Sequence, residues 1–488
     1  MKNFFIFILI LLLFPVLFIR FQTDADVYAY MGRLLVNGYI PYIDGWDHKG
    51  ISLYFINAIG YLIGFKSITG IKILEVLLIG YSFLTFYKTL SKKYSEIIAF
   101  ISMTVGVFTL KYFFDGGNLT EEYGVIFVLI SLSLFLKNQL KTIDYAIIGA
   151  LFVVNLTIRA NLISFWGVLF LVYCLQLILK TISLKNFLLS FLRMSYGAIT
   201  IIGVYFIYFL STGSLQHFID AAFIFNFSYS NATLASTFDA ILTSVTRYHL
   251  SFIFLIGFIV SIIRFFKDKT RTLELILIFW IPLELYFSNM SNRLYAHYFL
   301  MWIPMLILSC AVIINDLKER FKFSNKKILI TSFLLFMICF YVPIYMTFMN
   351  YKTIVFGNET SKSEKISNHI INNYKDHTLL VWGNNSEIYN LTNKISPISS
   401  FYQSTFKYDT ELVRNKINAF SKQILDKKPS LIIDAKRNGM LHLDLFNKVV
   451  IDDSQKRNLK EFSSIIKTQY VFEEEKFGID FYILVNNE

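Results

Sequence analysis

Acidic, basic and aromatic side chains gather directly after the first hydrophobic run of the chain. Residues 23–50, TDADVYAYMGRLLVNGYIPYIDGWDHKG, follow an apolar run that ends at Ile19. The ionisable side chains of interest are Asp24, Asp26, Asp44, Asp47, His48 and Lys49. Carboxylates can take a proton from a hydroxyl or hold a metal ion, and cations bind phosphate. The mixture therefore predicts a site for a substrate that carries phosphate.

A second acidic segment, KYFFDGGNLTEEYG, occupies residues 111–124. Its carboxylates are those of Asp115, Glu121 and Glu122, and its two glycines permit a tight turn. One interpretation is a second part of the same site. The other is a helix start, at which Asn118 or Thr120 caps the helix and the glutamates favour its dipole. The sequence leaves both interpretations open.

Two cationic segments complete the set. Arg159 lies in TIRANL (157–162), and Arg293, Tyr295 and His297 lie in SNMSNRLYAHYFLMWIP. An Arg at a membrane boundary often only reaches the lipid headgroups, and Tyr is common in interfacial belts. Together, however, the four segments would place carboxylates, cations and aromatic rings on one membrane face. That arrangement is expected of a site for a lipid phosphate.

The elements that position these residues are predicted to be membrane helices. The chain of 488 residues is 55% hydrophobic and only 16% charged, whereas soluble domains average about 25% charged residues. Apolar runs near membrane-spanning length recur as far as about residue 350. We therefore expect a polytopic α-helical membrane protein. The net charge of +12 follows membrane topology and does not predict a nucleic-acid partner.

The apolar runs predict about eleven membrane spans. They cover residues 3–20, 70–90, 95–111, 122–137, 143–158, 161–180, 189–211, 250–266, 272–288, 297–315 and 327–349. Segment 51–64 is too short to cross and is expected to lie along the interface. Lys and Arg concentrate in alternate short loops, which predicts that the N-terminus lies inside and the C-terminus outside. The loops expected to face outward are 21–69, 112–121, 212–249 and 289–296.

A short interfacial helix is predicted after the first span. Apolar residues recur at helical spacing from Val27 to Leu35, and Gly38 provides a stop. Asp24 or Asp26 would then sit at the N-cap, near the positive end of the helix dipole. Capping alone is the simpler interpretation of an acidic residue at a helix start.

The composition becomes polar from about residue 351. Strands are predicted at 378–383, 430–435 and 481–486, and amphipathic helices at 362–374 and 411–425. We therefore expect two domains. Residues 1–350 would form a transmembrane bundle whose external loop 21–69 carries the site, and residues 351–488 a small extracytoplasmic α/β domain.

The first loop resembles that of a known enzyme family. DADVYAYMGRLLVNGYIPYIDGWDHKGISLYF is similar to the first external loop of GT-C-type membrane glycosyltransferases, in the branch of protein O-mannosyltransferases and the lipid A aminoarabinose transferase. The resemblance continues in GGNLTEEYG, IRANL, RLYAHYFLMWIP, VWGNNSEIY and KPSLIIDA, and so covers nearly the whole chain. It implies a GT-C-like bundle, a polyprenyl-phosphate sugar as donor, and reaction on the external face.

The resemblance also implies roles for particular residues. The catalytic aspartate of the family's first loop best matches Asp24, by its distance from Tyr28, and Asp26 is the second choice. Many relatives have Asp-Glu there, whereas this chain has Asp-Ala-Asp, so both remain candidates for the base. The family's acidic position at the start of a later span matches Glu121, and Glu122 less well.

The expected chemistry is a single displacement. A lipid phosphate is a good leaving group that needs only cations to stabilise its departure, and one carboxylate base would give inversion. The predicted catalytic residues are Asp24, Asp26 and Glu121. The predicted substrate-binding residues are Tyr28, Tyr42, Asp47, His48, Lys49, Glu122, Arg159, Arg293, Tyr295 and His297. A divalent metal ion is a candidate cofactor.

The predicted function is thus glycosyl transfer in cell-envelope glycan modification, at a bacterial cytoplasmic membrane. The acceptor would be a glycan, a teichoic acid, a lipid or a protein. One alternative is a polymerase or ligase of surface polysaccharides, which would favour a larger external loop than 212–249. Another is a transporter or flippase, which would place ionisable residues at mid-bilayer. The charges gather at one surface instead, which favours the transferase.

Overall fold

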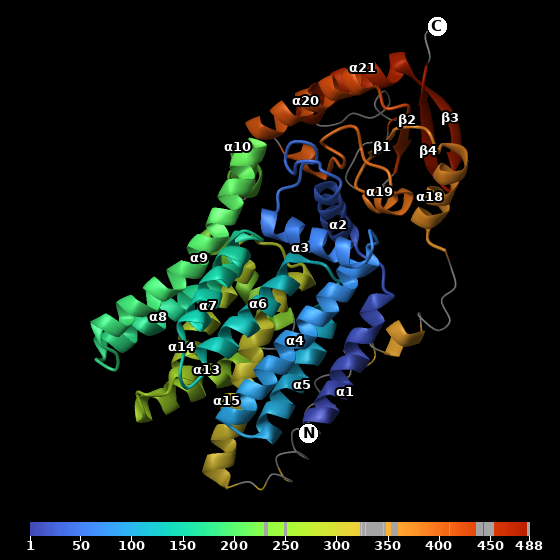
Figure 1. Ribbon diagram of the computed structural model, residues 1–488. Helices are drawn as coiled ribbons and strands as arrows, with labels where there is room; N and C mark the ends of the chain where they lie inside the picture. Colours follow the sequence, from blue (N-terminus) through green and yellow to red (C-terminus); the bar gives the residue numbers. More distant parts are fainter. Residues whose placement is uncertain are drawn as a thin grey trace. The chain divides into compact units, whose positions relative to one another are not determined.

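The computed structural model is built mostly of helices (Figure 1). It describes residues 1–228, 233–247, 251–322, 360–408, 410–435 and 453–485, together with 324, 327, 345, 348–352 and 443. The chain divides into two compact units. The helical unit comprises the described parts of Met1–Arg20, Lys72–Tyr208 and Ala232–Gly357. The sheet-containing unit comprises those of Phe21–Ile71, Phe209–Asn231 and Asn358–Glu488.

The helical unit contains the long apolar helices. They are α1 (Lys2–Leu13), α4 (Thr69–Lys93), α5 (Glu96–Phe113), α6 (Thr120–Phe135), α7 (Thr142–Leu156), α8 (Ser164–Ile178), α9 (Leu184–Thr212), α12 (Leu234–Arg247), α13 (Ser251–Lys267), α14 (Thr272–Asn289) and α15 (Trp302–Phe321). Short 3-10 turns adjoin three of them: η1 (Phe14–Leu17), η2 (Ala160–Ile163) and η4 (Ala296–Met301).

Six helices in the described part of the chain are long and apolar enough to cross a membrane, and seven if a bent pair counts as one span. The prediction of a helical membrane protein is confirmed, whereas the number of about eleven spans stays a prediction. Two of the predicted spans correspond to shorter apolar helices, Lys2–Leu17 and Thr142–Leu156. The predicted interfacial segment 51–64 forms the helix α3 (Ile51–Ile63). Most of the predicted span 327–349 lies outside the described residues.

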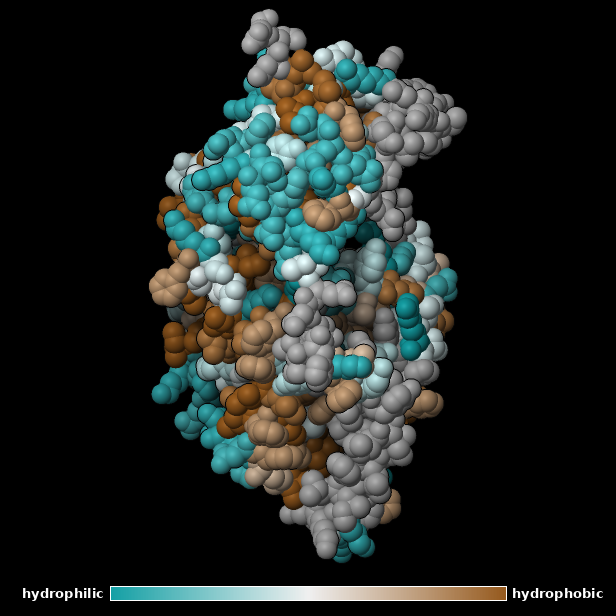
Figure 2. Space-filling view, turned by 90° about the vertical axis from the view of Figure 1, so that its right-hand side faces the viewer, coloured by the Kyte–Doolittle hydropathy of each residue, from teal (hydrophilic) through white to brown (hydrophobic). Residues whose placement is uncertain are grey.

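The surface of α9 is suited to lipid rather than water. Only 11% of its most apolar window is buried inside the protein. Leu188, Leu192, Ile199 and Ile207 are among its large exposed side chains. A helix that is apolar on nearly every side needs an apolar solvent. On the face shown in Figure 2, hydrophobic side chains gather over the helical unit and hydrophilic ones over the sheet-containing unit.

The sheet-containing unit combines the first loop with the C-terminal part of the chain. Its helices are α2 (Thr23–Val36), α3, α10 (Leu215–Ile219), α11 (Phe225–Ser228), α18 (Lys362–Asn373), α19 (Glu387–Thr392), α20 (Glu411–Lys427) and α21 (Asp453–Gln469), with a π-helical turn η3 (Asp220–Ile224) and a 3-10 turn η5 (Ser404–Lys407). Its strands are β1 (Leu379–Trp382), β2 (Leu431–Asp434), β3 (Tyr470–Lys476) and β4 (Ile479–Leu484). The three strands predicted from the sequence correspond to β1, β2 and β4.

The four strands form one mixed sheet in the order β1-β2-β4-β3. β1 and β2 are parallel, with Leu379 opposite Leu431, and their connection contains α20. The pairs β2–β4 and β4–β3 are antiparallel. Every residue of β1 and β2 is buried, as expected for parallel strands covered on both faces.

Helices cover both faces of this sheet. The ring of Trp382 in β1 lies 6.0 Å from Phe420 of α20 and 4.6 Å from Phe462 of α21. Phe481 of β4 lies in the row of paired residues next to the row that contains Trp382. Its ring stacks on that of Tyr374, which follows α18, at a centroid distance of 5.6 Å. Successive residues of a strand point to opposite faces. The sheet therefore lies between α20 and α21 on one side and α18 on the other (Figure 1).

The helix α2 is anchored to the C-terminal part of this unit. The Tyr30 hydroxyl accepts a hydrogen bond from the Ser396 amide at 2.9 Å, and its ring lies 4.1 Å from that of Phe401. The buried Arg33 guanidinium donates to the Asn393 side chain at 3.0 Å and to the Lys394 carbonyl at 2.5 Å. Burying a guanidinium is costly unless its donors are matched, so these contacts fix the orientation of α2.

Two glycines allow α7 and α9 to approach closely within the helical unit. A Cβ atom on Gly197 would lie 1.7 Å from the carbonyl oxygen of Ala146, and one on Gly149 would lie 1.8 Å from that of Met194. Helix pairs in membranes rely on such small residues because backbone contact replaces the hydrophobic effect.

We therefore expect Gly197→Ala to destabilise the protein by about 1–3 kcal/mol, since the methyl group forces the two backbones apart. Gly203→Ala on the same helix is the matched control, because a Cβ there meets nothing within 4 Å and Ala favours a helix by about 1 kcal/mol over Gly. Unfolding of the purified protein in detergent measures both. Equal stability of the two variants would contradict the close approach.

Candidate functional site

The two candidate bases occupy the first turn of α2 but differ in exposure. The N-cap of α2 is Gln22, so the prediction that Asp24 or Asp26 forms the N-cap is wrong. The helix starts earlier than the apolar periodicity indicates, which places both carboxylates inside its first turn, where they still favour the dipole. Asp24 is exposed, whereas Asp26 is only 4% exposed.

Asp26 is held by the C-terminal part of the sheet-containing unit. The side-chain amide of Asn390 donates to the Asp26 carbonyl oxygen at 3.0 Å and lies 3.3 Å from its Oδ1. A carboxylate that is buried and hydrogen-bonded is less free to meet an incoming hydroxyl than an exposed one. The structure thus distinguishes two carboxylates that both remain candidates for the base in the sequence.

Asp47 is the most completely buried carboxylate of the first loop. It is 1% exposed and accepts hydrogen bonds from Tyr54 at 2.7 Å and from Tyr402 at 2.5 Å. The Nδ1 atom of His48 lies 3.2 Å from its Oδ1. Burial alone would raise the pKa of Asp47, but the hydrogen bonds and charges of its neighbours, His48 foremost, outweigh burial and hold that pKa well below its usual range. Asp47 is therefore ionised.

His48 and Lys49 extend the chain of contacts that begins at Asp47. Burial and the charge of Lys49 lower the pKa of His48 against the opposing effects of Asp47 and Asp24, so the ring is neutral near pH 7. The Lys49 ammonium lies 3.0 Å from His48 Nε2, which suits a neutral ring that accepts at Nε2. Lys49 is thus held by an imidazole that Asp47 orients.

Aromatic residues enclose the same loop. Tyr42, at a φ of 72°, donates its hydroxyl to the Lys49 carbonyl at 2.9 Å. Tyr42 and Tyr28 are each 3% exposed, so their rings pack within the protein. The side-chain amide of Asn226 donates to the His48 carbonyl at 2.8 Å. The loop around residues 42–49 is therefore fixed by contacts on several sides.

Lys416 is a member of this group that sequence reasoning missed. Its ammonium lies directly over the Trp46 ring, 2.7 Å from the centroid, and interacts electrostatically with the Asp47 carboxylate. The nitrogen of this ammonium is buried, although the residue as a whole is partly exposed, and it makes no hydrogen bond to any described residue. Burial lowers the pKa of Lys416 well below its ordinary value, and Asp47 opposes that effect. Nothing in the local sequence of α20 distinguishes this lysine from its exposed neighbours.

In the helical unit, the structure joins Glu121 directly to Arg159. The Arg159 guanidinium forms an ion pair with Glu121 Oε1, and the Thr120 hydroxyl donates to Oε2 at 2.7 Å. Glu121 is 2% exposed. The guanidinium also lies 4.3 Å from the centroid of the Tyr298 ring, a cation–π contact. Both oxygens of Glu121 are therefore engaged within the protein.

The residues predicted near 293–298 gather beside this ion pair. The His297 ring lies 4.8 Å from that of Tyr298 and stacks at 5.7 Å on that of Tyr295. His297 Nδ1 is 3.7 Å from a carboxylate oxygen of Asp115. The loop that precedes η4 also contains Arg293, which is partly buried. The helical unit thus holds a mixed group of acids, cations and rings.

Glu122 supports the start of α6, as the helix-start interpretation of this segment expects, and its role in substrate binding stays a prediction. The N-cap of α6 is Leu119, so the interpretation in which Asn118 or Thr120 caps the helix is wrong. The Glu122 carboxylate instead accepts from the Leu119 amide at 2.9 Å. The positive φ of Asn118 explains the difference, because that residue forms the turn before the helix.

Glu75 of α4 completes the support of this turn and was missed in the sequence. It is fully buried, and its carboxylate accepts from the Asn118 amide at 2.7 Å. A Cβ on Gly117, whose φ is +91°, would lie 2.7 Å from Glu75 Oε2, so only glycine fits there. A glutamate within an apolar run was the signal that could have found it.

The donor groups do not favour a resident metal ion. In the parts of the chain that the structure describes, no group of three or more His, Cys, Asp or Glu side chains could hold one. Glu121, one of the predicted catalytic carboxylates, already engages both of its oxygens. A divalent ion therefore stays a prediction, and no chemical step is assigned to it.

The structure brings the predicted residues together in two groups. In the sheet-containing unit, Tyr42, Asp47, His48 and Lys49 are in mutual contact. In the helical unit, Glu121 contacts Arg159, and Tyr295 contacts His297. Each group combines anionic, cationic and aromatic side chains. Each could therefore bind part of an anionic or sugar-bearing ligand.

Comparison with known sequences gives no match. No family model matches the chain, and neither does any curated protein sequence.

Comparison with solved structures does give matches. ArnT from Cupriavidus metallidurans in the apo state superposes with a TM-score of 0.65 and 10% identity, over 98% of this chain and 96% of that one. ArnT from the same organism bound to undecaprenyl phosphate superposes with a TM-score of 0.62 and 10% identity, over 98% of this chain and 97% of that one. The third match is the archaeal oligosaccharyltransferase AglB from Archaeoglobus fulgidus, in complex with an inhibitory peptide and a dolichol-phosphate. It superposes with a TM-score of 0.51 and 12% identity, over 99% of this chain and 74% of that one. The chain therefore has the fold of the GT-C glycosyltransferases, as the resemblance in its sequence implies.

Proposed function

We propose that this membrane protein transfers a sugar from a polyprenyl-phosphate donor to an acceptor hydroxyl, with inversion, on the external face of a bacterial cytoplasmic membrane. The observation that carries the proposal is the shared fold with ArnT, which extends over 98% of this chain and 97% of the ArnT bound to undecaprenyl phosphate. The acidic and cationic groups described above supply chemistry that such a reaction requires. The acceptor would be a glycan, a teichoic acid, a lipid or a protein of the cell envelope.

In the proposed reaction Asp24 is the general base. Its exposed carboxylate takes the proton from the acceptor hydroxyl as the hydroxyl oxygen bonds to the anomeric carbon. The bond between that carbon and the phosphate oxygen breaks, and the polyprenyl phosphate leaves with the electron pair. Asp26, held by Asn390, is assigned a positioning role in α2.

The leaving phosphate needs cations that are not already neutralised. Lys49 fits this need because its partner is the neutral imidazole of His48 rather than a carboxylate. Lys416 fits it because its buried ammonium has an aromatic face as its near neighbour, and charge interactions are stronger away from water. We assign these two lysines to the phosphate. The aromatic rings around them would exclude water from the reacting bond.

The helical unit supplies the second set of proposed ligands. Arg159, Arg293 and His297 remain candidates for anionic groups, and Tyr295, 53% exposed, presents a ring for a sugar face. We assign Glu121 the role of orienting the Arg159 side chain, since the two form an ion pair.

The base assignment predicts different losses for the two aspartates. Asp24→Asn should reduce turnover by about 10²–10⁴-fold, the usual contribution of a general base. Asp26→Asn should retain turnover within about tenfold, because an amide can keep the contact with Asn390. The measurement is release of free polyprenyl phosphate from a panel of polyprenyl-phosphate sugars, with cell-envelope extract as the acceptor source and thermal unfolding as the check on folding. The reverse order of losses would move the base to Asp26, and unchanged turnover in both would refute the site.

The Lys416 assignment predicts a conflict between stability and activity. Lys416→Met removes a buried charge without a hydrogen-bond partner, so it should raise the unfolding temperature while reducing donor turnover at least tenfold. Lys422→Met is the control, because that residue lies exposed on the same helix and should change neither quantity. A destabilised or fully active Lys416→Met protein would show instead that the lysine is structural.

The lowered pKa of Lys416 predicts how the stability difference depends on pH. Below the lowered folded-state pKa the cost of the buried charge is present in full. As pH rises from there toward the ordinary value of about 10.4, the folded state binds fewer protons than the unfolded chain, so wild type gains stability. The difference in stability between Lys416→Met and wild type, measured in unfolding scans, should therefore become smaller as the pH rises. A constant gap would contradict the lowered pKa.

A further inference from the structure

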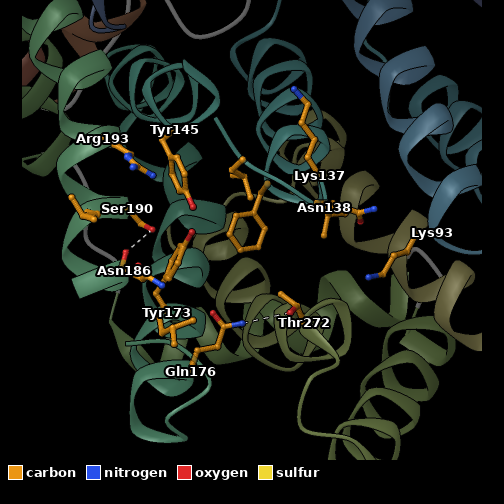
Figure 3. A pocket seen from close by; sticks show the side chains of 15 residues that line it. Lys93, Lys137, Asn138, Tyr145, Tyr173, Gln176, Asn186, Ser190, Arg193 and Thr272 are labelled. Carbon is orange, nitrogen blue, oxygen red and sulfur yellow. Dashed lines mark hydrogen bonds between the residues drawn. The ribbon is translucent and has the colours of Figure 1, made fainter. Parts of the chain in front are cut away.

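A polar cavity of about 520 Å³ lies in the helical unit, and none of the residues assigned to transfer lines it (Figure 3). It is bordered by the last residue of α4, the loop after α6, the first turns of α7 and α9, the last turns of α8 and the first residue of α14. All of these adjoin loops rich in Lys and Arg, which the sequence predicts to face the cytoplasm. Cavities of this size are typical of small-molecule sites.

Two cations point into the cavity from opposite sides. Figure 3 shows the ammonium of Lys93 and the guanidinium of Arg193 directed toward the enclosed space. Arg193 lies 5.8 Å from the centroid of the Tyr145 ring, and no ion pair links it or Lys93 to a carboxylate within the described residues. A third lining cation, Lys137, is already paired with Asp144 at 2.6 Å. The two remaining cations give the cavity a positive charge that its described lining does not neutralise.

Neutral polar groups line the space between these cations. The Ser190 hydroxyl donates to the Asn186 carbonyl at 2.9 Å, and the Gln176 amide reaches the Thr272 hydroxyl at 3.5 Å. The side chain of Asn138 stands on the other side of the cavity (Figure 3). No acidic residue is among the described residues that line it. An anion with several oxygens suits this lining.

A separate apolar groove of about 450 Å³ lies farther along the same helices and shares no lining residue with the cavity. The residues of α9 that border the cavity run from Asn186 to Arg193, and those that border the groove from Phe191 to Ala198. On α7 the lining likewise passes from Tyr145 to Phe152. At 1.5 Å per residue, positions 186–198 span about 18 Å, close to the roughly 15 Å of one leaflet's hydrocarbon.

We propose that the cavity and groove together bind one anionic glycerophospholipid. Its phosphodiester would lie between Lys93 and Arg193, its polar headgroup among the neutral side chains, and one acyl chain along the groove. The combination carries the proposal, because a soluble phosphate would contact the cations but would not occupy the neighbouring apolar groove, which follows the cavity along α9. The site is separate from the proposed transfer reaction and does not depend on it.

The test measures lipid retained by the purified full chain, using native mass spectrometry after titration with phosphatidylglycerol or phosphatidylcholine. We expect about one phosphatidylglycerol per chain and little phosphatidylcholine. Lys93→Gln and Arg193→Gln should each lower phosphatidylglycerol retention at least fivefold. Lys185→Gln is the matched control, since Lys185 is an exposed cation at the start of α9 that does not line the cavity. Unfolding in neutral detergent verifies that each variant is folded.

Two further arms separate the lipid from other sources of phosphate. Ala198→Trp fills the groove without removing a charge and should also lower retention, whereas excess inorganic phosphate should not displace the lipid. Equal retention of the two lipids, or an equal loss in Lys185→Gln, would overturn the site. Stabilisation by inorganic phosphate alone that disappears in Arg193→Gln would show a site for a soluble phosphate and overturn the lipid proposal.

Discussion

A carboxylate removed from water must be matched by donors and positive charge, and Asp47 meets this requirement through residues far apart in the sequence. Tyr54 of α3 and Tyr402 of the C-terminal part donate to its two oxygens, and Lys49 adds its positive charge. Because the two tyrosines come from different elements, the loop before α3 can keep its conformation only if both are in place. The position of Lys49 follows from that constraint, since the imidazole that Asp47 orients also contacts its ammonium.

Two buried cations in the same unit illustrate how structural and functional charges differ. The two terminal nitrogens of Arg33 donate to the Asn393 side chain and the Lys394 carbonyl, although its Nε has no partner among the described residues, so these contacts help to define the position of α2. The ammonium nitrogen of Lys416 is also buried, but it meets an aromatic face and has no hydrogen-bond partner among the described residues. An unmatched charge lowers stability. Such a cost is typical of residues whose partner is a ligand.

Much of this fold could be predicted from local patterns, because apolar periodicity is a property of neighbouring residues. It located the helix after the first span, the short interfacial helix and three of the four strands. It did not locate the start of α2, where Gln22 caps the helix without a side-chain bond. The pairing of Asp47 with Tyr402 and of Asp26 with Asn390 joins positions more than 350 residues apart. No spacing rule reaches that distance, so the sequence could not separate Asp24 from Asp26. Glu75 was within reach, as an isolated carboxylate in an apolar helix.

The ion pair in the helical unit limits what its two members can do at once. While Arg159 is paired with Glu121, much of its charge is satisfied, and it attracts a phosphate less strongly than a free guanidinium would. Glu121 accepts from Arg159 and Thr120 together, which disfavours a role as proton acceptor or metal ligand. The roles that the sequence suggested for each residue separately are thus in competition. A ligand that binds Arg159 must compete with Glu121 or add to the same guanidinium, which has five donors. If the ligand adds to the same guanidinium, Glu121 still orients Arg159 while the ligand is bound.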